Sequence, residues 1–218
     1  MTFSIGIRTM PRKQNYIGQT LQRLLESGTL QHPDVKGLHL HHGEGISPNQ
    51  NGCRALLAAA KDEAEWVIFL EDDIDVIDDF IPSIQRWLTD WERQDVMAYP
   101  LCCFYSDATR EFAKRGAYDI PISKYYGSQG ILFRTPDAVD YANWLTSLGK
   151  SFERDVSFDI HLSQWHTERL PKQKTLVTPA PCFIDHIGEF SLMGDPGSWA
   201  RVGPVEGFGG REFRYREI

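Results

Sequence analysis

Four acidic side chains lie within five consecutive positions in the first half of the chain, and their spacing indicates metal chemistry. They are Glu71, Asp72, Asp73 and Asp75. Carboxylates this close together repel one another unless a cation or solvent lies between them. Oxygen ligands of this kind suit Mg²⁺ or Mn²⁺, which often keep several waters and bridge to substrate phosphates. The cluster therefore predicts a divalent-metal site that acts on a phosphorylated substrate.

The residues directly before this cluster strengthen the prediction. Trp66-Val67-Ile68-Phe69-Leu70 is an unbroken apolar run, and a fully apolar strand between helices is typical of a central parallel strand buried on both faces. Carboxylates at the end of such a strand indicate a metal site more specifically than a run of charges in polar surroundings does. The alternative is a solvated helix N-terminus, because Asp72, Asp73 and Asp75 would also favour its positive end.

The elements that must position this cluster alternate between strands and helices. Apolar runs predict strands at residues 3–7, 35–40, 66–70 and 96–105, with further strand signals at 131–133 and 177–184. Helical spacing predicts helices at 15–28, 51–64, 74–91, 136–148 and 158–170, and residues 106–124 look irregular. This alternation favours an α/β fold with a mainly parallel central sheet flanked by helices. Ligands in such sheets bind beyond the carboxyl ends of the strands, where the acidic cluster falls.

Composition narrows the class of protein further. The 218 residues carry a net charge of −7, and a field of that sign disfavours non-specific binding of nucleic acid over the whole surface. No run approaches the ~18 apolar residues of a membrane span. The first residues do not form a signal segment. A cytoplasmic protein with one main domain is therefore expected, and the oligomeric state is left open.

The order of Asn51-x-x-Arg54 and the run from Trp66 to Asp73 resembles the DxD region of the GT-A fold glycosyltransferases. The resemblance implies a single Rossmann-like domain of the GT-A type. It also implies that Asn51 and Arg54 belong to the part that binds the nucleotide sugar. The last carboxylate of the motif, Asp73, would hold Mn²⁺ or Mg²⁺, and Asp72 would contact the nucleotide sugar.

Three further residues complete this part of the resemblance. Glu71 would bind the ribose or support the groups that do. Asp75 allows the motif to be read as Asp73-x-Asp75, in which Asp75 is a metal ligand as well. A late histidine completes the metal shell in this superfamily, and His186 stands at the matching place. The alternative for His186 is a core histidine satisfied by a backbone partner.

Other segments resemble the parts of such enzymes that hold the donor. Arg8 and Thr9, at the end of the first strand, match the place that holds the nucleotide base. The segment that ends in Gly130 resembles the glycine-containing loop that faces the donor sugar and the acceptor. Ser191 lies in the loop after the late histidine, which would cover the diphosphate.

The segment from Ser157 to Leu162 resembles the place where a Glu-Asp pair opens a helix and supplies the general base. Asp159 would then accept the proton of an acceptor hydroxyl. Phe158 stands where the glutamate is usual, and this departure leaves Asp155 as a rival for the role. The structural alternative for Asp159 is that it caps the helix.

A second group of metal-ligand residue types, His39, His41 and His42, invites a zinc interpretation. Alternation along a strand would place these side chains on different faces, which argues against a shared ion. We expect them to be loop and surface groups.

Together these features predict a metal-dependent glycosyltransferase in residues 1–194, with a glycine- and arginine-rich tail at 195–218. It would move a sugar from a nucleotide-diphosphate donor, with UDP-sugars favoured, to a hydroxyl acceptor with inversion. A glycan fits the acceptor, and a modified base in DNA fits the arginines of the tail. A sugar nucleotidyltransferase is the second candidate, although residues 8–13 lack its glycine-rich loop. A non-catalytic module that binds metal or carbohydrate is the third.

Overall fold

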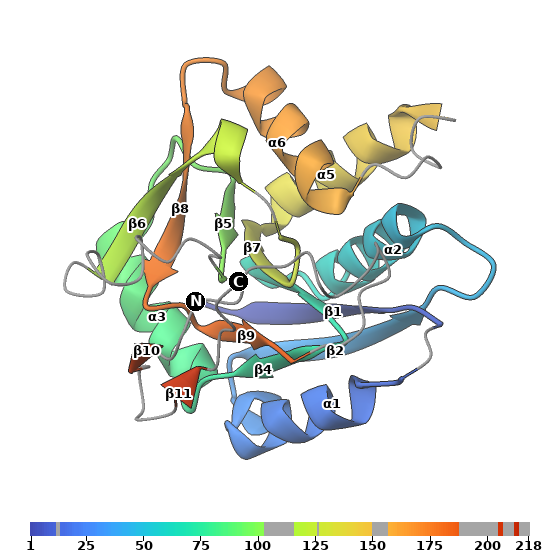
Figure 1. The fold of residues 1–218 in the computed structure, drawn as a ribbon, viewed down its shortest axis with the longest axis vertical. Coiled ribbons are helices and arrows are strands. Elements are labelled where there is room, and N and C mark those ends of the chain that lie inside the picture. The colour runs from blue at the N-terminus through green and yellow to red at the C-terminus, as the bar shows by residue number, and fades with distance from the viewer. Residues whose placement is uncertain are drawn as a thin grey trace.

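A five-stranded sheet forms the centre of the computed structural model (Figure 1). The structure describes residues 1–11, 14–102, 116–125, 127–149 and 157–187, and the strands β10 (Val205–Glu206) and β11 (Glu212–Phe213). Across the sheet the strands are β2 (Val35–His42), β1 (Phe3–Thr9), β3 (Trp66–Glu71), β7 (Gly130–Arg134) and β5 (Ala98–Pro100). β1 runs parallel to both of its neighbours, whereas β7 runs antiparallel to β3 and β5. Four of these five strands therefore share one direction, which confirms the predicted mainly parallel sheet.

Helices cover both faces of this sheet (Figure 1). They are α1 (Ile17–Glu26), α2 (Pro48–Ala60), α3 (Phe80–Trp91), α5 (Thr135–Ser147) and α6 (Phe158–Arg169). Successive side chains of a strand point to opposite faces, and β3 divides its residues accordingly. Ile68 and Leu70 share a core with side chains of α1 and α3, whereas Val67 and Phe69 share a second core with α2, α5 and α6. The α/β class predicted from the sequence is confirmed.

Local signals explain where α2 begins. The Oγ atom of Ser47 accepts the backbone N–H of Gln50 at 3.1 Å, and the side chain of Gln50 accepts the N–H of Ser47 at 3.2 Å. This reciprocal cap satisfies two donors that the helix itself leaves open. Pro48 follows at the start of the helix, where a missing N–H is tolerated. The helix therefore begins before Asn51, the residue at which the sequence pattern placed its start.

The segment after the acidic cluster differs from the prediction of one helix over residues 74–91. Ile74–Val76 forms the strand β4, which pairs antiparallel with β9 (Ile184–His186), and α3 begins only at Phe80. Burial of the β-branched Ile74 and Val76 side chains favours the strand. Pro82 lies in the first turn of α3, where it breaks no helical hydrogen bond. The acidic cluster is therefore not a helix N-terminus, and that alternative is wrong.

The second half of the chain also contains more strand than predicted. Part of the stretch expected to be irregular forms β6 (Gly116–Pro121), which pairs antiparallel with β8 (Thr175–Ala180). A short 3₁₀ turn at Ile122–Lys124 follows β6. The last predicted strand region is divided between β8 and β9. Within the described ranges, no helix combines the length and the apolar character needed to cross a membrane.

The three neighbouring histidines lie on the edge strand β2 rather than in a loop. His39 pairs with Asp62 at 2.7 Å between Nε2 and Oδ2, and the same carboxylate oxygen accepts a hydrogen bond from the buried Ser4 hydroxyl at 2.5 Å. These contacts join β1 and β2 to the segment that follows α2, so His39 has a structural partner.

Candidate active site

The carboxyl ends of β1 and β3 meet at one edge of the sheet, and several predicted site residues gather there. Arg8 and Glu71 are register partners on these two strands. Because β7 runs in the opposite direction, its first residue, Gly130, pairs with Leu70 at the same edge. The backbone N–H of Glu71 donates to the oxygen of Gln129 at 2.9 Å. The acidic cluster and the loop that enters β7 are therefore neighbours, at the carboxyl ends of the parallel strands, where α/β sheets bind ligands.

A buried hydroxyl fixes the turn that carries Asp72 and Asp73. The Oγ1 atom of Thr20, on α1, donates to the backbone oxygen of Asp72 at 2.9 Å and accepts the N–H of Ile74 at 3.1 Å. Asp72 and Asp73 expose only 1% and 2% of their surface. Burial of charged groups is unfavourable without compensating partners. The turn is therefore a buried part of the protein that Thr20 holds by hydrogen bonds, and not a solvated acidic surface.

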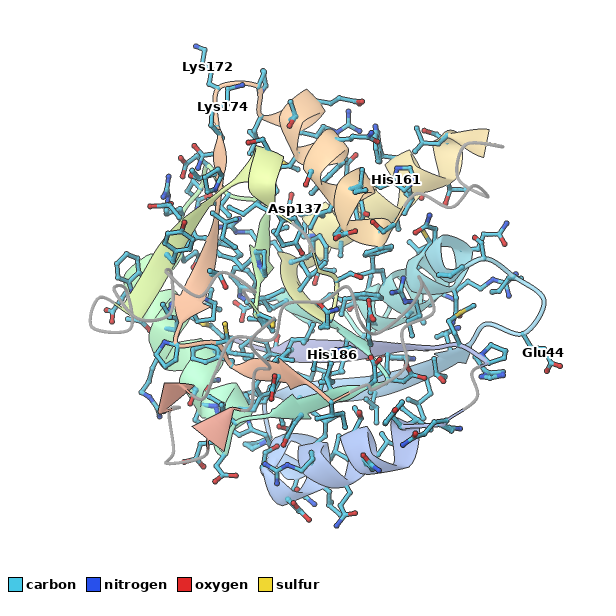
Figure 2. All side chains as sticks on the ribbon, in the orientation of Figure 1. Glu44, Asp137, His161, Lys172, Lys174 and His186 are labelled. Carbon is cyan, nitrogen blue, oxygen red and sulfur yellow. The ribbon has the colours of Figure 1, made fainter. Side chains whose placement is uncertain are left out.

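Asp73 and His186 are in direct contact. Oδ2 of Asp73 lies 2.9 Å from Nε2 of His186, although the two residues are 113 positions apart in the sequence. Pairing of β4 with β9 brings them together, and the N–H of Ile187 donates to the backbone oxygen of Asp73 at 2.9 Å. Figure 2 shows His186 in its place on β9. The structure thus brings together two of the three residues that the resemblance selected as metal ligands.

Asp75 has a different partner. The Nε atom of Arg23, on α1, donates to Oδ1 of Asp75 at 2.5 Å. Arg23 also donates to the backbone oxygen of Val76 at 3.0 Å, so it fixes β4 at two points. A carboxylate held by a guanidinium is less available to a metal ion. The arrangement therefore favours Asp73 with His186 over the Asp73-x-Asp75 interpretation.

Glu71 belongs to a buried cluster with Arg8 and Ser128. Nη2 of Arg8 lies 2.5 Å from Oε1 of Glu71, and the hydroxyl of Ser128 donates to the same carboxylate oxygen. Nη2 of Arg8 also reaches Oγ of Ser128 at 3.4 Å, and Nη1 donates to the backbone oxygen of Pro48 at 3.3 Å. Ionised partners make these hydrogen bonds stronger than neutral ones. The cluster joins the ends of β1 and β3 to the loop before β7 and to the start of α2.

Asp159 is attached to the loop that enters β7. Its Oδ2 atom accepts the backbone N–H of Gly127 at 2.5 Å, across 32 residues of sequence. Asp159 exposes 7% of its surface. Ser157 occupies the N-cap position of α6, and Asp159 lies in the first turn, where its Oδ1 atom accepts the N–H of Ile160 at 3.0 Å. Tyr141 supports this end of the helix, because its hydroxyl donates to the backbone oxygen of Phe158 at 2.7 Å. Burial raises the pKa of Tyr141 well above its usual value, which keeps this hydroxyl protonated.

Asn51 holds two strand ends together. Its Nδ2 atom donates to the backbone oxygens of Thr9 and His41, each at 2.8 Å. Thr9 is buried at the end of β1, and Arg54 lies exposed on α2. Burial is the main cause of the lowered pKa of His41, and the charges of His39 and Arg54 add to it. The Asn51 amide therefore holds the ends of β1 and β2 together beside the predicted nucleotide-binding site.

Gly130 has no room for a side chain. A Cβ atom at this position would lie 2.1 Å from Cδ1 of Ile184, on β9. This glycine allows β7 and β9 to pack closely and lies within a strand rather than in an open loop. Two other predicted site residues, Asp155 and Ser191, lie outside the described residues.

Sequence reasoning did not identify Thr20 and Arg23, which fix the acidic turn and β4 from α1. A signal for Thr20 was present, because it interrupts the apolar stripe formed by Ile17, Leu21 and Leu24 on this helix. A polar residue in a buried stripe needs a hydrogen-bond partner, and here the partner is the turn after β3.

The donor set fits a divalent cation in part. A carboxylate and an imidazole are both suitable ligands for Mn²⁺, and Asp73 and His186 place one of each side by side. In the part of the chain that the structure describes, no group of three or more His, Cys, Asp or Glu side chains is arranged to hold a metal. Phosphate oxygens of a substrate and water are further ligands that Mg²⁺ usually takes.

Solved structures share the fold of this protein. A glycosyltransferase involved in the glycosylation of the major capsid of PBCV-1 matches 88% of this chain and 95% of its own, with a TM-score of 0.53 and 11% identity. Residues 1–349 of S. aureus TarS in complex with UDP-GlcNAc match 94% of this chain and 62% of that one, with a TM-score of 0.53 and 14% identity. No protein-family model matches the sequence, and no curated protein matches it significantly. The predicted GT-A type of fold is therefore confirmed by structural likeness.

Proposed function

We propose that this protein is a metal-dependent glycosyltransferase that uses a UDP-sugar as donor. The observation that carries the proposal is the contact of 2.9 Å between Asp73 and His186, two residues that the family resemblance selects as metal ligands. The same edge of the sheet carries Glu71 and the loop that enters β7. The TarS structure of the same fold holds UDP-GlcNAc, which supports a donor of the UDP type.

Asp73 and His186 would hold Mn²⁺ or Mg²⁺, and Asp72 would contact the nucleotide sugar. The ion, when bound, would offset the negative charge that grows on the leaving diphosphate. Thr20 and Arg23 keep the turn and β4 in place for this role. Thr9, Asn51 and Arg54 belong to the part proposed to receive the nucleotide, with Asn51 fixing the strand ends. The Arg8 guanidinium instead contacts Glu71, Ser128 and the backbone oxygen of Pro48.

Asp159 is the general base of the proposed reaction. It would take the proton from the acceptor hydroxyl while the acceptor oxygen bonds to the anomeric carbon. The bond from that carbon to the diphosphate breaks in the same step, and the nucleoside diphosphate leaves. One displacement of this kind inverts the configuration at the anomeric carbon. The Gly127 N–H supports the role, because it orients the Asp159 carboxylate at 2.5 Å.

Calorimetry with UDP-glucose, UDP-GlcNAc and GDP-mannose, each with and without Mn²⁺, tests the donor and the metal together. We expect a UDP-sugar to bind in the presence of Mn²⁺ and at least about tenfold more weakly without it, which corresponds to about 1.4 kcal/mol. Slow release of UDP with water as acceptor, followed by proton NMR of the first sugar formed, then gives the stereochemistry. Retained configuration would contradict the role of Asp159 as the base of a single displacement.

Release of UDP separates this proposal from the two other candidate functions. A sugar nucleotidyltransferase would bind a nucleoside triphosphate and a sugar phosphate and would release pyrophosphate. A non-catalytic module would bind Mn²⁺ or a glycan without releasing UDP. The hydroxyl acceptor is proposed as a class, and a glycan and a hydroxymethylated DNA base are the two acceptors to compare.

A further inference from the structure

Arg8 lies at a closed junction between distant parts of the chain. It exposes 9% of its surface. Its Nη2 atom contacts Glu71 at 2.5 Å and Ser128 at 3.4 Å, and its Nη1 atom contacts the backbone oxygen of Pro48 at 3.3 Å. The guanidinium therefore has its main hydrogen-bonding groups turned toward the protein, although the sequence suggested a contact with the nucleotide base.

Two aromatic rings pack against the same guanidinium. Its central carbon lies 5.5 Å from the ring centroid of Phe69 and 5.4 Å from that of Phe158. The two rings are stacked, with centroids 4.7 Å apart. A cation near aromatic rings gains a further attraction, which is larger when the group is withdrawn from water. Arg8 thus connects the acidic carboxylate of Glu71 with the first residue of α6.

Phe158 is held tightly on its other sides as well. Gly52, on α2, has no space for a side chain, because a Cβ atom there would lie 2.7 Å from Cε2 of Phe158. Tyr141 binds the backbone oxygen of Phe158, and its ring meets the Phe158 ring edge-on at 5.1 Å between centroids. The backbone that leads into Asp159 is therefore fixed by the packing of Phe158.

The loop that holds the Asp159 carboxylate is fixed by the same cluster. Gly127 donates its N–H to Asp159. The next residue, Ser128, contacts both Arg8 and Glu71 through its hydroxyl. Gln129 accepts the backbone N–H of Glu71 at 2.9 Å. Arg8 therefore acts on Asp159 by two routes, through Phe158 before it and through the loop beside it.

We infer that Arg8 is a positioning residue, whose buried guanidinium sets the place of the Asp159 carboxylate. This inference rests on the proposed function only in assigning catalysis to Asp159. A lysine would not replace it, because one ammonium lacks the flat fork that serves Glu71, Ser128 and Pro48 at once. Phe158 stands where the enzymes that the sequence resembles often have glutamate. Its packing against Arg8 helps to fix the backbone next to Asp159.

The test compares Arg8→Lys with Arg169→Ala. Arg169 lies at the other end of α6, where it pairs with Asp140 at 2.8 Å, so its loss loosens the same helix away from Asp159. The first measurement is hydrogen exchange of the Gly127 amide by NMR, which requires no activity. We expect exchange at least about tenfold faster in Arg8→Lys and unchanged in Arg169→Ala, because exchange reports local opening.

The second measurement is steady-state release of UDP from the UDP-sugar that calorimetry selects. We expect Arg8→Lys to lower kcat about 100-fold, as a small misplacement of a catalytic group does, with KM for the donor within about twofold of the original value. A raised KM with unchanged kcat would overturn the inference, because it would indicate direct donor binding by Arg8. A folded Arg8→Lys protein with normal Gly127 exchange and normal kcat would overturn it too.

Ser128→Ala covers the case in which Arg8→Lys does not fold. It removes one hydroxyl from the same cluster, and we expect faster Gly127 exchange and a lower kcat, with unchanged KM. Unchanged exchange and kcat in this variant would count against the inference. If the original protein releases no UDP under any condition, the proposed function fails, and the Gly127 exchange still decides whether Arg8 positions Asp159.

Discussion

Nε2 of His186 lies 2.9 Å from Oδ2 of Asp73, and this contact depends on a strand pair that joins distant parts of the chain. β4 follows the acidic turn directly, and β9 ends at His186. The hydrogen bond from Ile187 to the backbone oxygen of Asp73 continues this pairing toward the turn. The geometry of the proposed metal pair is therefore set by backbone structure as well as by side chains.

Replacement of Asp73 by asparagine tests the metal assignment. Asparagine keeps the size of the side chain but removes its charge, so we expect Mn²⁺ to lose its effect on UDP-sugar binding. In calorimetry the affinity of Asp73→Asn with Mn²⁺ should fall at least about tenfold, to the level of the original protein without Mn²⁺.

Asp75→Asn is the matched control for this experiment. It removes a carboxylate of the same cluster that pairs with Arg23. We expect donor binding to keep its full dependence on Mn²⁺, with a loss of stability of up to about 1 kcal/mol, because partly exposed ion pairs contribute little. The reverse result, with Mn²⁺ dependence lost in Asp75→Asn and kept in Asp73→Asn, would favour Asp75 as the ligand.

Asp159→Asn separates catalysis from binding. Loss of a general base should lower kcat by about 10²–10⁴-fold, whereas donor affinity should stay within about twofold because no donor contact is removed. Asp155→Asn is the comparison, since the sequence leaves Asp155 as a rival. Steady-state release of UDP measures kcat, and calorimetry measures affinity. Full activity in Asp159→Asn together with lost activity in Asp155→Asn would reassign the role.

Much of the fold could be predicted because its signals are local. The apolar run of β3 and the helical spacing of α5 and α6 identify those elements within a few residues. The start of α3 could not be predicted in this way, because β4 is a strand only through its pairing with β9. A short segment such as Ile74–Val76 takes its conformation from a distant partner, which local periodicity does not contain.

The candidate site also has features that the sequence could predict and features that it could not. Asp73 and His186 could be selected because the acidic motif and the late histidine follow each other along the chain in the same order as in the superfamily that the sequence resembles. Their contact, and the different partner of Asp75, depend on strand pairing and on Arg23. The function of Phe158 also required the structure, because its packing against Arg8 and Gly52 is a property of three separate segments.

Gly6 on β1 should be intolerant of even one added methyl group. A Cβ atom at Gly6 would lie 2.5 Å from the backbone oxygen of Ala55, on α2. Because backbone cannot move aside as a side chain does, we expect Gly6→Ala to lower the free energy of unfolding by about 1–3 kcal/mol. Gly18→Ala is the control, since nothing lies within 4 Å of the added atom. That change in α1 should be neutral or stabilising by up to about 1 kcal/mol, and urea unfolding measures both. Equal stabilities of the two variants would contradict the close approach of β1 and α2.

His166, on α6, should make the protein less stable in acid. Its side chain is fully buried, and neither ring nitrogen has a hydrogen-bond partner among the described residues. Burial lowers the pKa of His166 from 6.5 to about 4, against a smaller opposite effect of Asp95. Between these two pH values the unfolded chain binds a proton that the folded protein does not, so stability falls as the pH falls.

His166→Leu removes this proton uptake and so isolates its effect. From pH 7.5 to pH 5 the original protein should lose about 2 kcal/mol more free energy of unfolding than the variant. Burial raises the pKa of Asp137 to about 6, which has the opposite sign, because the folded protein then holds a proton that the unfolded chain releases. Asp137 is present in both proteins, so its contribution cancels when their urea unfolding curves are compared at each pH. Parallel pH dependences of the two proteins would mean that His166 is protonated equally in the folded and unfolded states, contrary to its burial.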